Sequence, residues 1–130
     1  KLGVKPGYVV RVLSCPKDVD VVRLLQPLAA GASIVHRRTK KNPEIVVCFA
    51  ESARELQVSL PKAIEAIARD GAVWVFWPKK SSLRFKSGSR DITEDTIRVC
   101  AIELGVVDVK VCAVDETWSG LKLVYRLADR

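Results

Sequence analysis

Residues that commonly hold metal ions or transfer protons are scarce in this sequence. Among 130 residues there are one histidine, His36, and four cysteines. The cysteines are Cys15, Cys48, Cys100 and Cys112. They form no Cys-x-x-Cys pair, and His36 does not lie at ligand spacing from any of them, which argues against a zinc site or a thioredoxin-like motif. We therefore expect no metal, and the isolated thiols favour the reducing cytoplasm.

Long apolar stretches are missing as well. The longest segment without a charged residue, 24–36, is interrupted by Gln26, Pro27 and Gly31. A membrane-spanning helix needs about 20 consecutive apolar residues, so we predict that no segment crosses a membrane. No secretory signal is visible. The chain also contains no methionine, so we expect a trimmed form of a longer chain. Whether a targeting segment preceded it stays open.

The residues that are present suffice for a core. Hydrophobic residues make up 48% of the chain and charged residues 28%, a balance that argues against disorder. A protein of this length buries roughly two-thirds of the surface that its unfolded form exposes, so it needs no disulfide or metal to hold it together. We predict a single domain over residues 1–130.

The net charge of +7 is concentrated in two segments that contain no acidic residue. The first holds Arg37, Arg38, Lys40 and Lys41, and the second holds Lys79, Lys80, Arg84, Lys86 and Arg90. Since these nine cations exceed the net charge, the rest of the chain carries a net −2. This distribution indicates two local sites of attraction for anions rather than a uniformly basic protein.

Strand and helix patterns alternate along the chain. Continuous β-branched runs, typical of strands covered on both faces, predict strands at 9–13, 32–37, 45–49 and 72–77. Apolar spacing and capping residues predict helices at 18–28, 52–67 and 91–104. We expect Pro61 to split the second helix, and Asp91 with Glu94 to form the capping box of the third. The strands 107–114 and 121–127 alternate in polarity, and their linker 115–120 is too short for a parallel crossover, so they form an antiparallel hairpin at a sheet edge.

One connection leaves the topology open. Only residues 38–44 join the second predicted strand to the third, which is too few for a crossover helix. Either this segment runs extended across the sheet, or the second strand is antiparallel. In both cases Lys40 and Lys41 lie away from the edge formed by the carboxyl ends of the strands.

The order of these elements resembles a shortened class I methyltransferase, whose last strand inserts antiparallel into a Rossmann-like sheet. The phrases Lys5-Pro6-Gly7, Asp70-Gly71 and Leu104-Gly105 precede strands at the places where such enzymes have theirs. The resemblance implies an α/β fold with three layers. We expect an open, mostly parallel sheet of about six strands, three to four helices and a C-terminal antiparallel hairpin.

A second resemblance is more specific. Trp77-Pro78-Lys79-Lys80 and the segment from Val111 to Lys122 are similar to a family of small bacterial proteins known only as a domain of unknown function. This resemblance implies no activity.

The sequence departs from the methyltransferase pattern at two cofactor contacts. S-adenosylmethionine and NAD need a glycine-rich turn after the first strand and an acidic residue after the second. Here the first turn is Ser14-Cys15-Pro16-Lys17-Asp18, and the second strand ends in His36-Arg37-Arg38. We predict a methyltransferase-like scaffold without a cofactor, and do not expect S-adenosylmethionine to bind.

Ligands of open α/β sheets bind at the carboxyl ends of the parallel strands, where the segments 14–17, 50–52, 78–81 and 115–120 should converge. We predict that an anionic ligand, either a phosphate-containing small molecule or a nucleic acid, binds there. The candidate binding residues are Lys17, Trp77, Lys79, Lys80, Arg84, Lys86, Asp115, Trp118 and Ser119. The cations would neutralise phosphates, and Trp77, Phe85 or Trp118 would stack on a base. The plainer interpretation of the segment 79–90 is a solvated loop.

Other functions stay open. An enzyme acting on a small anionic substrate could use Cys15, which follows a strand and precedes a helix near Lys17, as its nucleophile. Asp115 and Glu116 could serve as acid and base, or Asp115 could pair with Lys79 or Lys80. The plainer interpretation of these groups is structural. The remaining alternatives are a degenerate S-adenosylmethionine-dependent methyltransferase and a scaffold that binds another protein. Because the candidate catalytic groups have plainer structural interpretations, we lean towards a protein that is not an enzyme.

Overall fold

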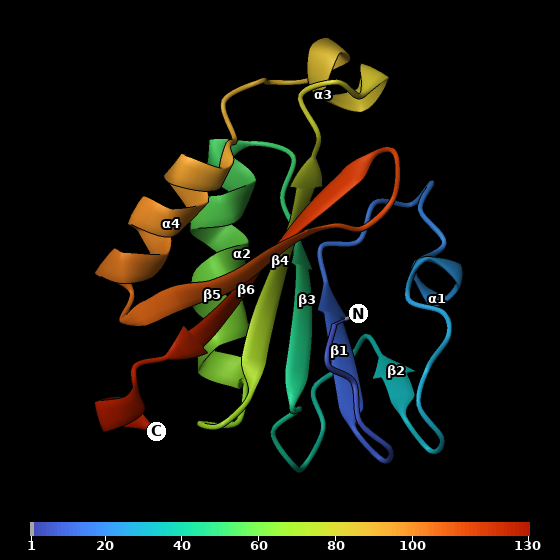
Figure 1. Ribbon diagram of the computed structural model, residues 1–130, viewed down its shortest axis with the longest axis vertical. Helices are drawn as coiled ribbons and strands as arrows, with labels where there is room; N and C mark the ends of the chain where they lie inside the picture. The colour runs from blue at the N-terminus through green and yellow to red at the C-terminus, as the bar shows by residue number, and fades with distance from the viewer. Residues whose placement is uncertain (1) are drawn as a thin grey trace.

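The computed structural model describes residues 2–130, which form a six-stranded mixed sheet with helices on both faces (Figure 1). The strands are β1 (Val9–Leu13), β2 (Ser33–Val35), β3 (Ile45–Phe49), β4 (Ala72–Pro78), β5 (Val106–Ala113) and β6 (Trp118–Tyr125). The helices are α1 (Val21–Leu24), α2 (Ala53–Ala66), α3 (Leu83–Ser87) and α4 (Glu94–Glu103), followed by a 3₁₀ turn at Leu127–Asp129. The strand order is β2-β1-β3-β4-β6-β5. The expected three-layer, Rossmann-like α/β fold is confirmed.

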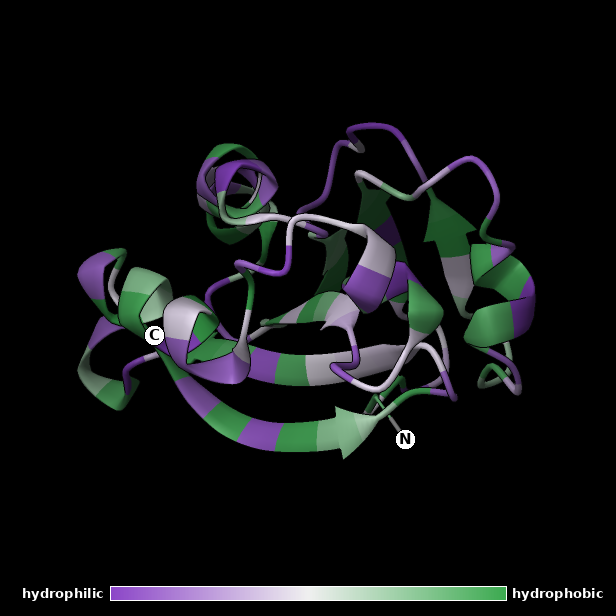
Figure 2. Cartoon of the chain, turned by 90° about the horizontal axis from the view of Figure 1, so that it is seen from above, coloured by the Kyte–Doolittle hydropathy of each residue, from purple (hydrophilic) through white to green (hydrophobic). Residues whose placement is uncertain are grey.

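Two apolar clusters fill the space on either side of the sheet. One lies between the sheet and the helices α2 and α4, and the other lies on the face that α1 covers. Successive side chains of a strand point to opposite faces, and β1 follows this rule, since Val10 and Val12 belong to the second cluster while Leu13 packs against the first. Figure 2 shows the same alternation as hydrophilic and hydrophobic bands along β5.

The direction of β2 settles the question that the sequence left open. β2 pairs with β1 in parallel, with Val35 opposite Arg11, and β3 pairs in parallel with the other side of β1. The connection 36–44 therefore runs extended from one side of β1 to the other. Lys41 lies away from the carboxyl ends of the strands, as expected, because it pairs with Glu44 directly before β3.

Three details of the helices differ from the sequence predictions. α1 is much shorter than 18–28, because Asp20 caps it from within that range by accepting a hydrogen bond from the Arg23 N–H. α2 is not split by Pro61. Proline removes the hydrogen bond to the carbonyl of Gln57, but both residues are exposed, so water can satisfy that carbonyl while the buried face of α2 holds the helix on the sheet.

The third difference concerns the start of α4. The predicted capping box of Asp91 and Glu94 is wrong, because Thr93 caps the helix reciprocally with Thr96. The Asp91 carboxylate instead accepts a hydrogen bond of 3.0 Å from the backbone N–H of Ala53. Asp91 thus ties the segment before α4 to the first turn of α2.

The C-terminal hairpin has a tighter connection than predicted. β6 begins at Trp118, so Trp118, Ser119 and Gly120 belong to the strand and not to the loop. β6 lies between β4 and β5 and pairs antiparallel with both, which makes β5 the edge strand. The predicted loop 79–90 also contains a helix, α3, capped by Ser82. Across residues 2–130, no helix is long and apolar enough to span a membrane.

Candidate ligand-binding rim

The carboxyl ends of β1, β3, β4 and β5 lie at one edge of the sheet, which we call the rim (Figure 1). The chain order reverses between β1 and β3, because β2 lies on one side of β1 and β3 on the other. Such a reversal is the topological switch point at which open α/β sheets bind ligands. α3 stands above this edge, beyond the end of β4 (Figure 1).

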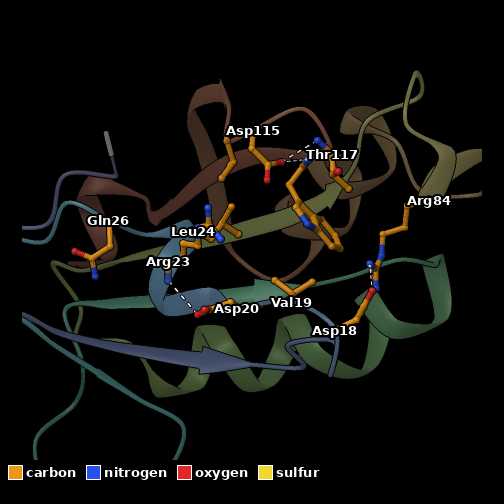
Figure 3. Close-up of a pocket in the computed structure, with 11 residues that line it drawn as sticks. Asp18, Val19, Asp20, Arg23, Leu24, Gln26, Arg84, Asp115 and Thr117 are labelled. Carbon is orange, nitrogen blue, oxygen red and sulfur yellow. Dashed lines mark hydrogen bonds and ion pairs between the residues drawn. The ribbon is translucent and has the colours of Figure 1, made fainter.

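Arg84 of α3 closes the switch point. Its Nη1 and Nη2 donate to the two carboxylate oxygens of Asp18, at 2.8 and 2.9 Å. Its Nε and Nη2 donate to the carboxylate of Glu51. Asp18 follows β1 and Glu51 follows β3, so one guanidinium ties together the two loops that border the switch point. We call these three residues the Arg84 clasp; Figure 3 shows its Asp18 arm.

The clasp rests on an aromatic pair. The guanidinium carbon of Arg84 lies 5.1 Å from the ring centroid of Trp118, within the range of a cation–π contact. Trp118 is only 3% exposed and meets Phe49 edge to face, with ring centroids 5.1 Å apart. Trp118 is therefore a packed residue that supports Arg84, and it does not offer the open stacking face that the sequence predicted.

The ion pairs fix the charges of the clasp. The hydrogen bonds to Asp18 and Glu51 raise the pKa of Arg84 above its usual value. The hydrogen bond from Arg84 is the largest cause that lowers the pKa of Asp18. Both carboxylates of the clasp already have a cation, and Arg84 has two anions. Arg84 is thus committed within the protein, although the sequence predicted that it would neutralise a phosphate.

A pocket of about 500 Å³ lies beside the clasp, between α1 and the β5–β6 loop (Figure 3). Its apolar wall is formed by Val19, Leu24, Val114 and Trp118. Its charged residues are the acids Asp18, Asp20 and Asp115 and the cations Arg23 and Arg84. Because acids outnumber cations and Arg84 is already paired, this pocket does not attract anions.

The lysines predicted to bind a ligand do not line this pocket. Lys17, Lys80 and Lys86 are exposed and Lys79 is half-buried. Along with Arg90, they form no ion pair with any of residues 2–130. We call Lys17, Lys79, Lys80, Lys86 and Arg90 the rim cations. They remain free to meet an external anion.

The other predicted residues have mostly structural contacts. Trp77 is 6% exposed and packs in the cluster beneath α2 and α4, so it offers no face for stacking. Asp115 accepts 2.8 Å hydrogen bonds from the backbone N–H groups of Thr117 and Trp118, which shape the hairpin loop. Asp115 forms no ion pair with Lys79 or Lys80, the alternative that the sequence left open for it. Glu116 is exposed, and Ser119 is half-buried within β6.

Cys15 lacks the surroundings of a nucleophile. Burial and the neighbouring Asp18 raise the pKa of its thiol, and Arg84 only partly opposes them. Its Sγ lies 3.5 Å from the carbonyl oxygens of Pro16 and Val19. A reactive thiol needs a lowered pKa, so the geometry supports the structural interpretation. Burial also raises the pKa of Cys48, to about 12.

Sequence reasoning missed the clasp. The sequence shows Asp18 and Glu51 only as residues that follow strands, and it places Arg84 among the predicted ligand-binding cations. The one signal in the sequence is the position of these three residues, since each of them follows a different parallel strand. Their pairing depends on how α3 folds back over the rim, which no spacing in the sequence encodes.

Several solved structures that are similar to this fold are methyltransferases. Magnesium protoporphyrin IX methyltransferase from Synechocystis PCC 6803, with SAH bound, matches with a TM-score of 0.61 at 12% identity, over 93% of this chain and 75% of that one. An O-methyltransferase from neocarzinostatin biosynthesis, in complex with S-adenosylmethionine, matches with a TM-score of 0.57 at 14% identity, over 92% of this chain and 49% of that one. At such low identity these similarities show the fold alone.

A third similar structure is a TehB-like SAM-dependent methyltransferase from Corynebacterium glutamicum, with a TM-score of 0.53 at 9% identity, over 93% of this chain and 82% of that one. No curated protein matches this sequence. The expected methyltransferase-like architecture is confirmed. The model of one family, described as protein of unknown function (DUF3052), matches residues 1–127. The chain therefore belongs to this family of proteins of unknown function.

Proposed function

We propose that the protein is a non-catalytic cytoplasmic module that binds nucleic acid through the rim cations. The proposal depends on one observation. The five rim cations form no ion pair within residues 2–130, whereas Arg84, in the same basic segment as four of them, is paired with Asp18 and Glu51. Protein charges that have no internal partner are available to neutralise phosphates, and their counterions gain freedom on binding. Four free cysteines in residues 2–130 are consistent with a reducing compartment.

The shape of the rim favours a polymer over a small anion. The pocket at the rim is rich in acids, and none of the five rim cations lines it. Lys80, Lys86 and Arg90 instead lie on the exposed segment that carries α3 above the sheet. Cations spread over a protruding surface suit the repeated phosphates of a nucleic acid backbone.

Aromatic and apolar groups on α3 add a surface for bases. With Trp77 and Trp118 buried, the aromatic side chain left at the rim is Phe85, which is half-buried. Leu83, which lies two residues before Phe85 in α3, is 81% exposed. Stacking of unpaired bases on aromatic side chains beside a basic surface is the usual mode of binding single strands. We therefore take single-stranded nucleic acid as the ligand.

The second candidate function, an S-adenosylmethionine-dependent methyltransferase, draws support from the similar structures. The residues at the switch point do not fit that cofactor. No glycine lies between Gly7 and Gly31, so side chains stand where the cofactor needs bare backbone. β2 is followed by His36 and Arg37 rather than an acid. The Arg84 clasp also bridges the loops between which the cofactor would enter.

The proposal is tested by fluorescence anisotropy with a labelled single-stranded oligonucleotide. The variant Lys79→Gln/Lys80→Gln/Lys86→Gln is expected to bind at least about tenfold more weakly at 0.1 M salt. The slope of log affinity against log salt concentration should be smaller in magnitude by about 2, because three phosphate contacts are lost. The matched control Lys5→Gln/Lys110→Gln/Arg126→Gln removes the same charge from exposed sites away from the rim.

The control variant should bind as the wild type does. Equal weakening in both triple variants would mean that only the net charge matters, and the rim would not be the binding surface. Absence of any binding by the wild type at 50 mM salt would contradict the proposal outright.

A further inference from the structure

A second group of unpaired cations lines a cavity that shares no residue with the pocket at the rim. The cavity has a volume of about 640 Å³ and lies between β1, α2 and the connection 36–44. Its charged lining residues are Arg11, Arg38, Lys40, Lys62 and Glu65. Four cations thus face one carboxylate, and none of the five forms an ion pair within residues 2–130. The neighbouring Lys41 differs, because it pairs with Glu44 at 3.3 Å.

Arg11 is the unusual member of this group. It interrupts the apolar run of β1, and it lies on the face opposite Val10 and Val12, half-buried. Its Nε is buried and has no hydrogen-bond partner, the one such side-chain atom found in the described part of the chain. A buried guanidinium nitrogen without a partner is destabilising, because the lost hydration is not replaced. The fold keeps this group in place without any protein acceptor for it.

The topology explains why a cavity forms here. In a doubly wound sheet with the strand order 3-2-1-4, the chain passes from the second strand through a third strand before it reaches the other side of the first strand. Helices of this connection cover the first strand. Here residues 36–44 alone make the return. This extended segment covers Arg11 with Arg38, Thr39 and Lys40, which leaves space beside α2 that a helix would have filled. The sequence thus places polar and basic groups where an apolar helix face would otherwise lie.

We propose that this cavity binds a small molecule carrying phosphate, such as a pyrophosphate group or a phosphate monoester. Guanidinium groups match phosphate oxygens in geometry, and lysines supply point charges around them. A phosphate oxygen would give the Arg11 Nε its acceptor, and Arg38, Lys40 and Lys62 would neutralise the charge. The site is distinct from the rim and does not rest on the function proposed for it.

The size and position of the cavity exclude a polymer as its occupant. It is lined by β1 on one side, by the end of α2 on another and by the connection 36–44. A phosphate at the end of a small molecule can enter it, whereas a continuous backbone would have to displace the connection. The phosphate therefore comes from a free small molecule and not from the nucleic acid that we propose for the rim.

Isothermal titration calorimetry with inorganic pyrophosphate at 0.1 M NaCl tests this site, with sulfate as the reference anion. We expect saturable binding of one pyrophosphate per chain, at least tenfold tighter than sulfate. Arg11→Gln should weaken it at least tenfold. Because Arg11 is half-buried, the double variant Lys40→Gln/Lys62→Gln provides a second test at exposed positions that the fold does not need, and it should weaken binding by a similar factor.

The rim variant Lys79→Gln/Lys80→Gln/Lys86→Gln separates the two proposals, since it should keep its affinity for pyrophosphate within about twofold. The proposal is overturned if pyrophosphate binds no more tightly than sulfate, or if the Lys40/Lys62 variant binds as the wild type does. Displacement of bound pyrophosphate by an oligonucleotide would also overturn it, because the cavity would then belong to a nucleic acid surface.

Discussion

Replacing Trp118 with alanine is expected to lower the free energy of unfolding by about 3–5 kcal/mol, the usual range for a buried aromatic residue. Trp118 is 3% exposed and packs edge to face on Phe49. It also opens β6, where it pairs with Pro78 at the end of β4. Its removal leaves a cavity beneath the Arg84 clasp, so we expect the rim to loosen along with the core.

Urea denaturation followed by circular dichroism measures this effect without relying on tryptophan fluorescence. Trp118→Phe is the matched control, because it keeps a ring against Phe49 and beneath Arg84. We expect it to retain at least half of the stability that the alanine variant loses. A loss below about 1 kcal/mol for Trp118→Ala, typical of a surface substitution, would show that Trp118 is not packed as described.

Replacing Arg84 with methionine is expected to lower the free energy of unfolding by about 2 kcal/mol at pH 7, because hydrogen bonds to charged groups and a cation–π contact are lost together. Methionine keeps apolar contact with Trp118 but leaves Asp18 and Glu51 without their shared cation. Lys86→Met is the matched control, since Lys86 lies on the same helix and has no ion pair within residues 2–130. It should change stability by less than about 0.5 kcal/mol.

The effect of Arg84 should depend on pH in a defined direction. Arg84 lowers the pKa of Asp18 in the folded protein. The stability that this interaction supplies is present above the pKa of an unfolded aspartate, about 4, and is lost as the pH falls through the lower folded value. The difference in stability between the wild type and Arg84→Met should therefore shrink below pH 4. A difference that stays constant from pH 7 to pH 2.5 would contradict the ion pairs.

Much of the fold could be predicted because its signals are local. Buried parallel strands appear in the sequence as continuous β-branched runs, and α2 begins close to its predicted start because Ser52 accepts a hydrogen bond from the Glu55 N–H. The alternation of the last two strands correctly indicated a hairpin. The errors lie where tertiary contacts override local preference. Asp91 was free to bond with Ala53 because Thr93 and Thr96 capped α4 instead.

The candidate site was less predictable because it depends on long-range pairing. An acid-free segment indicated free cations, yet Arg84 within it meets Asp18 and Glu51, which are distant in the sequence. The sequence positions of Trp77 and Trp118, near strand ends, predict binding residues, but both side chains are buried by packing. Arg11 received no role, since a single arginine in a strand gives no sign of the connection that later covers it.

Seven of the nine cations in the two basic segments divide into three groups in the structure. Arg84 is committed to the clasp, the rim cations remain available to a ligand, and Arg38 and Lys40 join Arg11 at the cavity. This division links the net charge to two proposed phosphate-binding surfaces. The ion pairs of Arg84 also close the switch point of the methyltransferase-like sheet.

Titration of the ¹⁵N-labelled protein, followed by NMR, tests the central claim most directly. A single-stranded oligonucleotide and S-adenosylhomocysteine are added in separate experiments, and the backbone amide shifts are mapped. The account predicts that the oligonucleotide shifts the amides of residues 79–90 and that S-adenosylhomocysteine leaves residues 14–20 unchanged. Saturable shifts of residues 14–20 by S-adenosylhomocysteine, with no response of residues 79–90 to the oligonucleotide, would contradict it and identify the rim as a cofactor site.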